Sequence, residues 1–569
     1  MLETPFEKEL FDGGIPFSEY PRPQLKRESY ICLNGKWSFT VLGKNEFEGE
    51  ITVPFAPESR LSGVERYTEK DDILVYSRRF SLPDGFNRGR VLLNFGAVDQ
   101  YADVFINGSL AGSHEGGYLP FSFDITDLIK KGENEITVNV SDPLDRALPY
   151  GKQTERSKGM WYTKISGIWQ TVWLESVPDR YIEGIKITPC ENGVTVKVKG
   201  GCEIKAITVK AGKRVIFQSF KGSSVFVRID EPRYWSPDDP YLYDITLTSG
   251  SDSVCSYFAL RTVEIKKVNG TPYICLNGKP IFLNGLLDQG YFSDGIFLPA
   301  TPAGFENDVI TMKKCGFNML RKHIKLEPEL FYYYCDKHGM IVFQDMINNG
   351  KYSFFFDTAL ATLFLKSGFE HRASKRQKKA FLDNSKGIIE QLYNHPCVCC
   401  YTVFNEGWGQ FDADGCYDYL KLLDGTRIFD ATSGWFAKKK SDVESHHVYF
   451  KKLDLKPKGV RPLVLSEFGG YSYKIKEHSF NLKNTYGYRF FTEKADFEKA
   501  LFALYENEVA DMIRRGLSAA VYTQVSDVED ETNGLFTYDR QLLKVDAKRM
   551  KEVNDKLYRL FEKVSGKES

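Results

Sequence analysis

Met340-Ile341-Val342-Phe343-Gln344-Asp345 is a short apolar run that ends on two polar side chains, and residues 397–404 form a second such run. A helical pattern near residues 382–393 lies between them. Strands that alternate with helices in this way are typical of parallel βα units. The alternation gives candidate strands at residues 281–286, 318–321, 340–345, 397–404, 427–430, 443–448, 462–465 and 519–524. Eight strands over about 300 residues predict a (β/α)8 TIM barrel, which we assign to residues 265–569.

The sequence before residue 265 has a different hydrophobic period. Short alternating runs are separated by turn residues, and no helical pattern of three turns interrupts them. Asn107-Gly108, for example, lies between two such runs and predicts a two-residue hairpin turn. We therefore expect a jelly-roll-like β-sandwich over residues 1–179. A second all-β block, residues 180–264, has the size of an immunoglobulin-like β-sandwich, so the chain is predicted to be multidomain.

Charge and composition limit the classes of partner. The 569 residues include 76 Lys plus Arg and 76 Asp plus Glu, which gives a formal net charge of zero. This balance argues against nucleic acid or an anionic membrane surface and favours a small neutral substrate. The first ten residues lack the basic and apolar segments of a signal peptide, and no apolar run approaches membrane-spanning length. We expect a cytoplasmic protein, and homo-oligomerisation stays open.

The eleven cysteines are scattered, and most lie in apolar runs. An odd number in a long chain favours free thiols over a disulfide framework. Cys397, Cys399 and Cys400 lie on one predicted strand, whose alternation sends Cys400 to the opposite face, so the three cannot ligate one tetrahedral metal. We predict neither a metal site nor a cofactor.

Two glutamates are the candidate catalytic residues. Glu406 and Glu467 each follow a short apolar run and precede a glycine, at the ends of the predicted fourth and seventh strands. A single glutamate at a strand end is usually a solvated residue, because perturbed active-site carboxylates are a minority of all acids. Two of them at the mouth of one barrel can flank a single bond, and hydrolysis of a glycosidic bond requires such a pair.

Other polar and aromatic residues near strand ends are candidate substrate ligands. The carboxyl ends of barrel strands face the substrate, so the side chains located there can contact a sugar. For the histidines and tryptophans a structural role is about equally expected, because these residue types are often partly buried. The candidate substrate-binding residues are Asp288, Arg321, His323, Asn405, Trp408, Trp435, His447, Tyr449, Tyr522 and Gln524.

Several motifs resemble those of glycoside hydrolase family 2, the family of β-galactosidases, β-glucuronidases and β-mannosidases. In the barrel they are Gly316 to His323, Asn405-Glu406 and Ser466 to Gly469. In the first block, Asp103 to Gly108 and Gly167 to Gln170 are similar to the sugar-binding-type sandwich of that family. The resemblance extends over nearly the whole chain, and the motifs occur in the family's order.

The resemblance implies a retaining, double-displacement β-glycosidase. Glu406 would then be the acid/base and Glu467 the nucleophile, and neither step needs a metal or cofactor. Asn405 would bind the sugar 2-hydroxyl, an interaction that strengthens in the transition state. Arg321 could keep Glu467 ionised through a charge-assisted hydrogen bond, Tyr449 could orient it, and His323 and His447 could donate to sugar hydroxyls.

One departure from the family bears on the sugar. Glucuronidases of the family bind the uronate through an Asn-x-Lys pair ahead of a Gly-aliphatic-Phe-Thr segment, and the corresponding stretch here is Glu531-Thr532-Asn533. An acid in place of Asn disfavours a uronate, so a neutral sugar is expected, with β-galactose first and β-mannose, β-glucose or a pentose after it. The alternatives are β-glucuronidase, β-mannosidase or α-L-arabinopyranosidase activity and, from other classes, a transglycosidase or a catalytically silent carbohydrate-binding protein.

Residues 347–380 form a long connection between the third and fourth predicted strands. Connections of this length on the active face of a barrel are usually lids or subsite walls. The aromatic residues 352–356 are interpreted as a wall for the aglycone, and packing against the barrel rim is an equally good interpretation. The basic run 371–379 is expected to be a solvated helix face.

Overall fold

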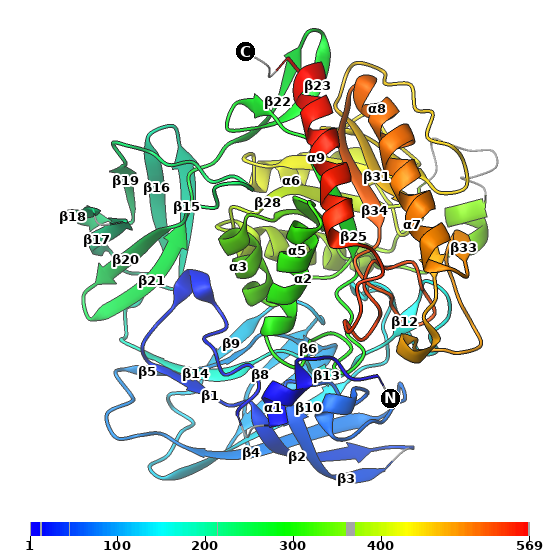
Figure 1. The fold of residues 1–569 in the computed structure, drawn as a ribbon. Helices are drawn as coiled ribbons and strands as arrows, with labels where there is room; N and C mark the ends of the chain where they lie inside the picture. The colour runs from blue at the N-terminus through cyan, green and yellow to red at the C-terminus, as the bar shows by residue number, and fades with distance from the viewer. Residues whose placement is uncertain (1, 12–13, 45, 213, 360–369, 567–569) are drawn as a thin grey trace.

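The computed structural model describes residues 2–11, 14–44, 46–212, 214–359 and 370–566. Figure 1 shows two β-sandwiches, coloured blue to green, and a barrel whose strands and helices run from green to red. Among the helices in the described ranges, none has both the length and the apolar character needed to span a bilayer. All eleven cysteines are free thiols, and most are buried.

The N-terminal sandwich packs a six-stranded sheet, in the order β3-β2-β4-β10-β7-β8, against a four-stranded sheet in the order β1-β14-β5-β9. Side chains alternate along each strand, so Tyr76, Leu93 and Val104 point inward and are fully buried. Asn107 and Gly108 both have positive φ and join β7 to β8, which confirms the predicted hairpin turn. The strands are β1 (Tyr30–Cys32), β2 (Gly35–Leu42), β3 (Phe47–Val53), β4 (Ile73–Ser81), β5 (Arg90–Phe95), β7 (Tyr101–Ile106), β8 (Ser109–Glu115), β9 (Phe121–Asp124), β10 (Glu133–Ser141) and β14 (Val172–Val177).

The second sandwich is smaller and has two antiparallel sheets, β15-β16-β19 and β18-β17-β20-β21. Val196 and Ile245 belong to its core and are buried. Its strands are β15 (Gly184–Cys190), β16 (Gly193–Lys199), β17 (Ile204–Ala211), β18 (Arg214–Gly222), β19 (Ser224–Arg228), β20 (Tyr243–Ser249) and β21 (Asp252–Phe258).

A three-stranded antiparallel sheet, β22 (Val263–Val268), β23 (Thr271–Leu276) and β24 (Lys279–Pro280), precedes the barrel and was not predicted. It is attached to the barrel where the N–H of Ile274 donates to Ser518 Oγ, 2.9 Å away. The remaining short elements of the first half are α1 (Glu7–Phe11), η1 (Pro23–Leu25), η2 (Arg60–Ser62), β6 (Val98–Asp99), β11 (Gln153–Thr154), β12 (Tyr162–Thr163) and β13 (Gly167–Ile168).

Eight parallel strands form the barrel, which confirms the predicted fold class. They lie in the order β29-β28-β27-β26-β25-β34-β31-β30, so neighbours in sequence are mostly neighbours in space. The two end strands meet where Ser433 Oγ of β29 lies 2.9 Å from His447 Nε2 of β30. The strands are β25 (Leu283–Asp288), β26 (Met319–Lys322), β27 (Ile341–Asp345), β28 (Val398–Asn405), β29 (Ile428–Ser433), β30 (Glu444–Val448), β31 (Leu463–Gly469) and β34 (Leu517–Thr523).

Helices cover only part of the barrel. The connections after β29 (residues 434–443) and after β30 (residues 449–462) are fully described and contain no helix, so the barrel departs there from the ideal βα repeat. The helices are α2 (Ala303–Lys314), α3 (Glu329–His338), α5 (Lys375–Leu392), α6 (Ala413–Leu423), α7 (Lys494–Ala503), α8 (Ala510–Arg514) and α9 (Ala547–Val564), with η3 (Phe354–Ala359), η4 (Lys476–His478), η5 (Leu504–Val509) and two short strands, β32 (Tyr471–Tyr473) and β33 (Arg489–Phe491).

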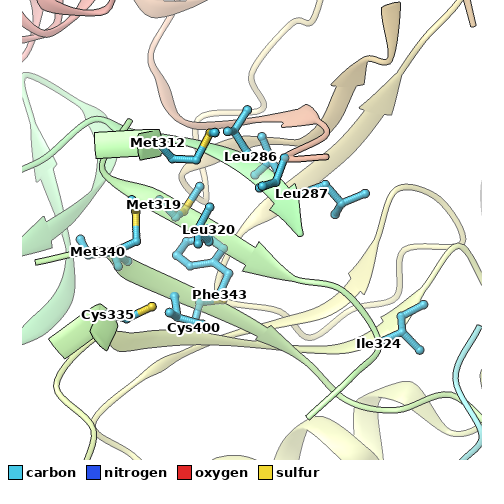
Figure 2. Packing of buried hydrophobic residues seen from close by; sticks show 14 of the residues in the cluster. Leu286, Leu287, Met312, Met319, Leu320, Ile324, Cys335, Met340, Phe343 and Cys400 are labelled. Atoms are coloured by element: carbon cyan, nitrogen blue, oxygen red, sulfur yellow. The ribbon is translucent and has the colours of Figure 1, made fainter. Parts of the chain in front are cut away.

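Figure 2 shows how apolar side chains hold the first four barrel strands in place. Leu286 of β25, Leu320 of β26, Phe343 of β27 and Cys400 of β28 belong to one buried cluster, together with Met312 of α2. Adjacent residues of a strand point to opposite faces, so such strands are apolar on both faces and polar only at their ends. The polar strand ends therefore gather at one rim of a rigid core.

Candidate active site

Glu467 lies in β31 and is almost completely buried. Its Oε1 accepts a hydrogen bond from Arg321 Nη1 at 3.1 Å, its Oε2 accepts one from the Tyr449 hydroxyl, and His447 Nδ1 is 3.5 Å from Oε2. Burial by itself raises the pKa of Glu467, but the neighbouring His447 and Arg321 outweigh it and hold that pKa below its ordinary value. Glu467 is therefore kept as a carboxylate, which is the form that a nucleophile needs.

Arg321 connects the surrounding acids. The guanidinium is completely buried and binds Asp345 through two nitrogens, at 2.9 and 3.0 Å. Its Nη2 also donates to Asn405 Oδ1 at 2.9 Å. Burial would lower the pKa of Arg321, but the charges of Asp345 and Glu467 raise it above the ordinary value. A permanent positive charge is thus fixed against both carboxylates, in the two-pronged geometry that suits Arg.

Glu406 follows the last residue of β28 in an unusual backbone conformation. Its φ is +53°, a region that side chains other than glycine seldom occupy, and Gly407 follows at +76°. The turn is held because the N–H of Glu406 donates to the carbonyl of Ser433 and its own carbonyl accepts from Trp435 Nε1, both at 3.0 Å. Such strained positions concentrate at functional sites, and here the strain turns the carboxylate toward His447 Nδ1, 2.8 Å away.

The two glutamates face each other across a short gap. One carboxylate oxygen of Glu406, one of Glu467 and a ring nitrogen of His447 lie within 4.8 Å of one another. The side chain of Glu406 is 17% exposed and that of Glu467 is 6% exposed. The buried, ion-paired acid and the more accessible acid therefore differ in environment, as a nucleophile and a proton donor must.

Within the described ranges, one group of three His, Cys, Asp or Glu side chains converges closely enough to bind a metal ion. It consists of these same three residues. The guanidinium of Arg321 lies 3.1 Å from Glu467 Oε1 and places a fixed positive charge there. This charge opposes a cation at the same carboxylate, so the geometry favours acid–base chemistry over metal binding.

Other predicted ligands line this network. The amide nitrogen of Asn405 has no hydrogen-bond partner within the described ranges, which leaves it available to a substrate hydroxyl, while its oxygen is held by Arg321. His323 Nδ1 lies 2.8 Å from Asp345 and 4.0 Å from Glu467, and burial lowers the pKa of this imidazole. Both ring nitrogens of His447 already have protein partners, so the geometry gives it a positioning role.

Two of the predicted ligands lie apart from the glutamates. Asp288 accepts from Lys322 Nζ at 2.6 Å and from the N–H of Gly290, so its carboxylate is used in a separate buried ion pair. Tyr522 is fully buried and packs against Phe468 in the barrel wall. The structure does not bring either side chain to Glu406 and Glu467, because a strand presents alternate residues to opposite faces and the sequence pattern does not say which face each residue occupies.

A cluster of polar side chains beside the site contains one predicted ligand, Gln524, together with Glu531 and Asn533 of the stretch that bears on the choice of sugar. Glu531 is buried and accepts hydrogen bonds from the hydroxyl of Tyr162 and from Gln524 Nε2 at 3.2 Å. Tyr162 lies in β12, in the segment between the sandwich strands β10 and β14, and was not predicted. Gln524 Nε2 also donates to Asn533 Oδ1 at 2.8 Å. Two buried atoms here, Gln524 Oε1 and Asn533 Nδ2, have no partner within the described ranges. Burial raises the pKa of Glu531, the hydrogen bond from Tyr162 and the ammonium of Lys152 lower it, and the charge of Glu467 raises it, so this polar cluster adjoins Glu467.

An aromatic wall borders this polar cluster and also comes partly from the segment between β10 and β14. Trp161 packs edge-on against Trp408 with centroids 4.9 Å apart, and Tyr352 packs on Trp161 at 5.0 Å. Trp408 is almost completely buried, and Trp161 is more accessible. Lys152 Nζ lies 5.4 Å from the Trp161 ring. No local signal could have located Trp161 or Lys152, because only the packing of the sandwich on the barrel brings them here.

The long connection after β27 is only partly described. Tyr352 packs on the aromatic wall, whereas Phe354 and Phe355 are largely exposed. Residues 360–369 of the predicted wall and lid lie outside the described residues. The basic run belongs in part to α5, whose first turn is capped by Ser374 and Gln377 in a capping box.

Three family models match successive parts of the chain. They are described as the galactose-binding domain-like part of glycosyl hydrolase 2 (residues 48–169), glycosyl hydrolases family 2 (residues 188–261) and the TIM barrel domain of glycosyl hydrolases family 2 (residues 263–557).

Individual relatives are distant. A β-galactosidase of Thermoanaerobacter pseudethanolicus is 25% identical over 64% of this chain and 49% of its own length. A β-glucuronidase of Bacteroides fragilis is 25% identical over 66% of this chain and 56% of its own length. The chain thus spans about half the length of the curated relatives it matches.

Solved structures share the whole architecture. A β-glucuronidase from an uncultured Clostridium superposes with a TM-score of 0.73 at 20% identity, covering 94% of this chain and 99% of that one. A β-galacturonidase from Eisenbergiella tayi superposes with a TM-score of 0.69 at 20% identity over 94% of this chain and 99% of its own. At 20% identity, these superpositions show a shared fold alone. The barrel model alone matches more than half of the sequence, and this chain belongs to glycosyl hydrolase family 2.

Proposed function

We propose that this protein is a retaining β-glycosidase that removes a terminal β-linked sugar by double displacement. The observation that supports this most directly is the pair of oxygens on Glu406 and Glu467, which lie within 4.8 Å of each other. Retaining enzymes hold their carboxyl groups roughly 5–5.5 Å apart, whereas inverting enzymes leave roughly 6.5–9.5 Å for a water molecule.

In the first step, a carboxylate oxygen of Glu467 attacks the anomeric carbon while the bond to the aglycone oxygen breaks. Glu406 gives its proton to that oxygen, so the aglycone leaves as an alcohol. Arg321 and the Tyr449 hydroxyl keep the attacking carboxylate ionised and fixed in orientation. Asn405 has a free amide N–H to offer the sugar as charge develops.

In the second step, a water molecule attacks the same carbon and Glu406 accepts its proton. The ester to Glu467 breaks and the carboxylate returns to its bonds with Arg321 and Tyr449. A sugar hydroxyl in place of water would give transglycosylation through the same intermediate. Product analysis at high acceptor concentration separates the two reactions.

For the sugar itself we propose a neutral residue, with β-galactose first. Glu531 supplies a buried acidic group beside Glu467, which disfavours a further anion at this place. The unpartnered Gln524 Oε1 and Asn533 Nδ2 offer one acceptor and one donor, which match sugar hydroxyls.

A second candidate substrate is a β-uronide, and Lys152 favours it. Lys152 is only 8% exposed and lies near Glu531, and no carboxylate of the described residues lies within ion-pair distance of its ammonium. A buried ammonium without a partner is costly, and the carboxylate of a uronate would supply one. Lys152 would then replace the lysine of the family's Asn-x-Lys pair.

A panel of nitrophenyl glycosides tests both parts of the proposal. We expect one β-glycoside to be cleaved with retention of anomeric configuration by NMR, and cleavage to vanish in Glu467→Ala. Lys152→Met should spare a β-galactoside and abolish cleavage of a β-uronide. Inversion of configuration, or full activity of Glu467→Ala, would contradict the mechanism.

A further inference from the structure

A cavity of about 220 Å³ lies at the junction between the second sandwich and the barrel. Its lining includes Ile187 and Pro189 of β15 and, from the barrel, Tyr393 and Pro396 just ahead of β28. Glu406 follows the other end of β28, an eight-residue strand of roughly 25 Å. The cavity and the glutamates therefore lie at opposite ends of the barrel.

Two arginines line this cavity, and they differ in what compensates their charge. Arg427 pairs with Asp424 at 2.7 Å, and its other four N–H groups donate to the Thr426 hydroxyl and to three backbone carbonyls. Arg261 makes three hydrogen bonds, all to backbone carbonyls, at 2.8–3.3 Å. A guanidinium has five N–H groups, so two of those on Arg261 have no partner in the described part of the chain.

Arg261 is also an exception among the buried arginines. It is 5% exposed, and no carboxylate of the described residues lies within ion-pair distance of it. Burial and the charge of Arg427 lower the pKa of Arg261 below its ordinary value. A buried cation without an anion is costly. The other buried arginines of the described ranges each bind at least one carboxylate, and they are Arg27, Arg321, Arg427 and Arg540.

The surroundings of the cavity add positive charge. Lys186 of β15 places its Nζ 3.9 Å from the centre of the Tyr393 ring, and no carboxylate among the described residues lies within ion-pair distance of that ammonium. The guanidinium carbon of Arg427 lies 5.1 Å from the centre of the same ring. Asp424 is the acid nearest to these cations by its contacts, and Arg427 already binds it. The net field in the cavity therefore attracts an anion.

Size and chemistry together select the class of ligand. The volume is below the roughly 300–1,000 Å³ of pockets for drug-sized molecules, so the cavity suits a small ion and excludes a polymer. Guanidinium N–H groups match the oxygens of phosphate and carboxylate in geometry as well as charge. A metal cation would be repelled by Arg261 and Arg427.

We propose that this cavity binds a small oxyanion, such as phosphate, which strengthens the junction between the second sandwich and the barrel. Asn394 already joins the two, because its Oδ1 accepts from the N–H of Ile187 at 2.8 Å and its Nδ2 donates to the carbonyl of Ile185 at 2.9 Å. An anion on Arg261 adds an ionic contact at the same place and supplies the missing counter-charge. The proposal does not depend on the reaction that the glutamates catalyse.

Calorimetric titration of the full chain with inorganic phosphate tests the site, with sodium chloride keeping the ionic strength constant. We expect one phosphate per chain in the wild type. The melting temperature should rise by about 2 °C or more and then level off as the site fills. Phosphate also stabilises proteins in general by exclusion from their surface, but that effect does not saturate. A rise without saturation, or no measurable binding, would overturn the proposal.

Variants of Thr262 locate the bound phosphate. Thr262 lines the cavity next to Arg261 and has an exposed side chain, so its replacement leaves the three carbonyl bonds of Arg261 intact. Thr262→Glu places a carboxylate at the cavity and should weaken phosphate binding about tenfold or more by like-charge repulsion. The matched control Thr262→Gln should bind phosphate as the wild type does. Equal affinities of the two variants would overturn the proposal.

A second control separates this cavity from the active site. Lys152 is the buried ammonium near Glu531, and it has no carboxylate partner within the described ranges. Lys152→Met should leave the phosphate isotherm unchanged, because the cavity lies at the other end of the barrel. Loss of phosphate binding in Lys152→Met, with binding retained in Thr262→Glu, would place the anion at the active site and contradict the proposal.

Discussion

The cluster around Arg321 and the polar cluster around Glu531 lie side by side, and they differ in how many of their polar atoms have hydrogen-bond partners. Arg321 has protein partners for its guanidinium nitrogens, and Glu467 has partners on both oxygens. In the cluster around Glu531, by contrast, Gln524 Oε1 and Asn533 Nδ2 are buried without partners, and Lys152 has no ion pair within the described ranges. The first region is preorganised for one reaction, whereas the second is incomplete until a ligand binds.

This difference predicts that variants in the first region damage the reaction or the fold, whereas variants in the second change the choice of sugar. The largest effect should come from Glu467→Gln, which keeps the size of the side chain and removes the nucleophile. We expect kcat to fall about 10⁴-fold or more, as for other covalent nucleophiles, with the fold intact. Steady-state kinetics with an aryl glycoside measure kcat, and a thermal melt checks the fold. A fall in kcat of less than tenfold would count against Glu467 as the nucleophile.

Loss of Arg321 should affect stability as well as activity. Arg321→Met leaves Asp345 and Glu467 buried without their cation, and breaking a buried pair in this way costs about 3–5 kcal/mol. The matched control is Arg79→Met, which removes an exposed pair with Glu133 and should cost less than about 1 kcal/mol. Urea unfolding measures the free energy of unfolding of both variants. Equal losses of that free energy would show that the buried ion pairs of Arg321 matter no more to stability than the exposed pair of Arg79.

Variants of the cluster around Glu531 should change substrate specificity more than stability. Lys152→Met and Glu531→Gln each remove a charge that has no rigid ion pair, so we expect only small shifts in melting temperature. The ratio of kcat/KM between a β-uronide and a β-galactoside should change about tenfold or more in opposite directions for the two variants. Equal losses of kcat/KM on both substrates would mean that the cluster around Glu531 has a structural role and does not select the sugar.

The smallest predicted effect is a displacement of the acidic limb of the pH profile. The pKa of Glu467 lies below the ordinary glutamate value, so the carboxylate persists into acidic solution and activity falls only where it becomes protonated. Tyr449→Phe removes a hydrogen bond to the charged form, which raises that pKa. The acidic limb of kcat/KM should therefore move to higher pH, and a shift to lower pH would contradict this role of Tyr449.

Much of the barrel could be predicted because buried parallel strands are apolar runs that end on polar residues. Their ends were harder to place: β31 continues through Ser466 and Glu467 to Gly469, whereas the apolar pattern stops at Leu465. Glu467 is an acidic residue inside this buried strand, so it interrupts the apolar pattern from which the strand was predicted. The absence of a helix from the described connections after β29 and β30 could likewise not be predicted from the alternation of strands and helices.

That Glu406, Glu467 and Arg321 lie close together could be predicted because strand ends meet at one rim, and their catalytic roles stay a proposal. Asp288 and Tyr522 were included by the same rule, but the face to which each points depends on tertiary packing. Lys152 and Trp161 belong to another domain and carry no motif, so only the three-dimensional structure places them beside the barrel.

The central claim is that Glu467 forms a covalent bond to the sugar, and it can be tested by trapping. Dinitrophenyl 2-deoxy-2-fluoro-β-galactoside and the matching β-glucuronide slow both steps, but their good leaving group lets the first step proceed, so the ester accumulates. Peptide mass spectrometry should find one fluoroglycosyl group per chain on the peptide that contains Glu467, and none in Glu467→Gln. A label on another residue, or no label from the fluoro analogue of a β-glycoside that the wild type cleaves, would contradict the account.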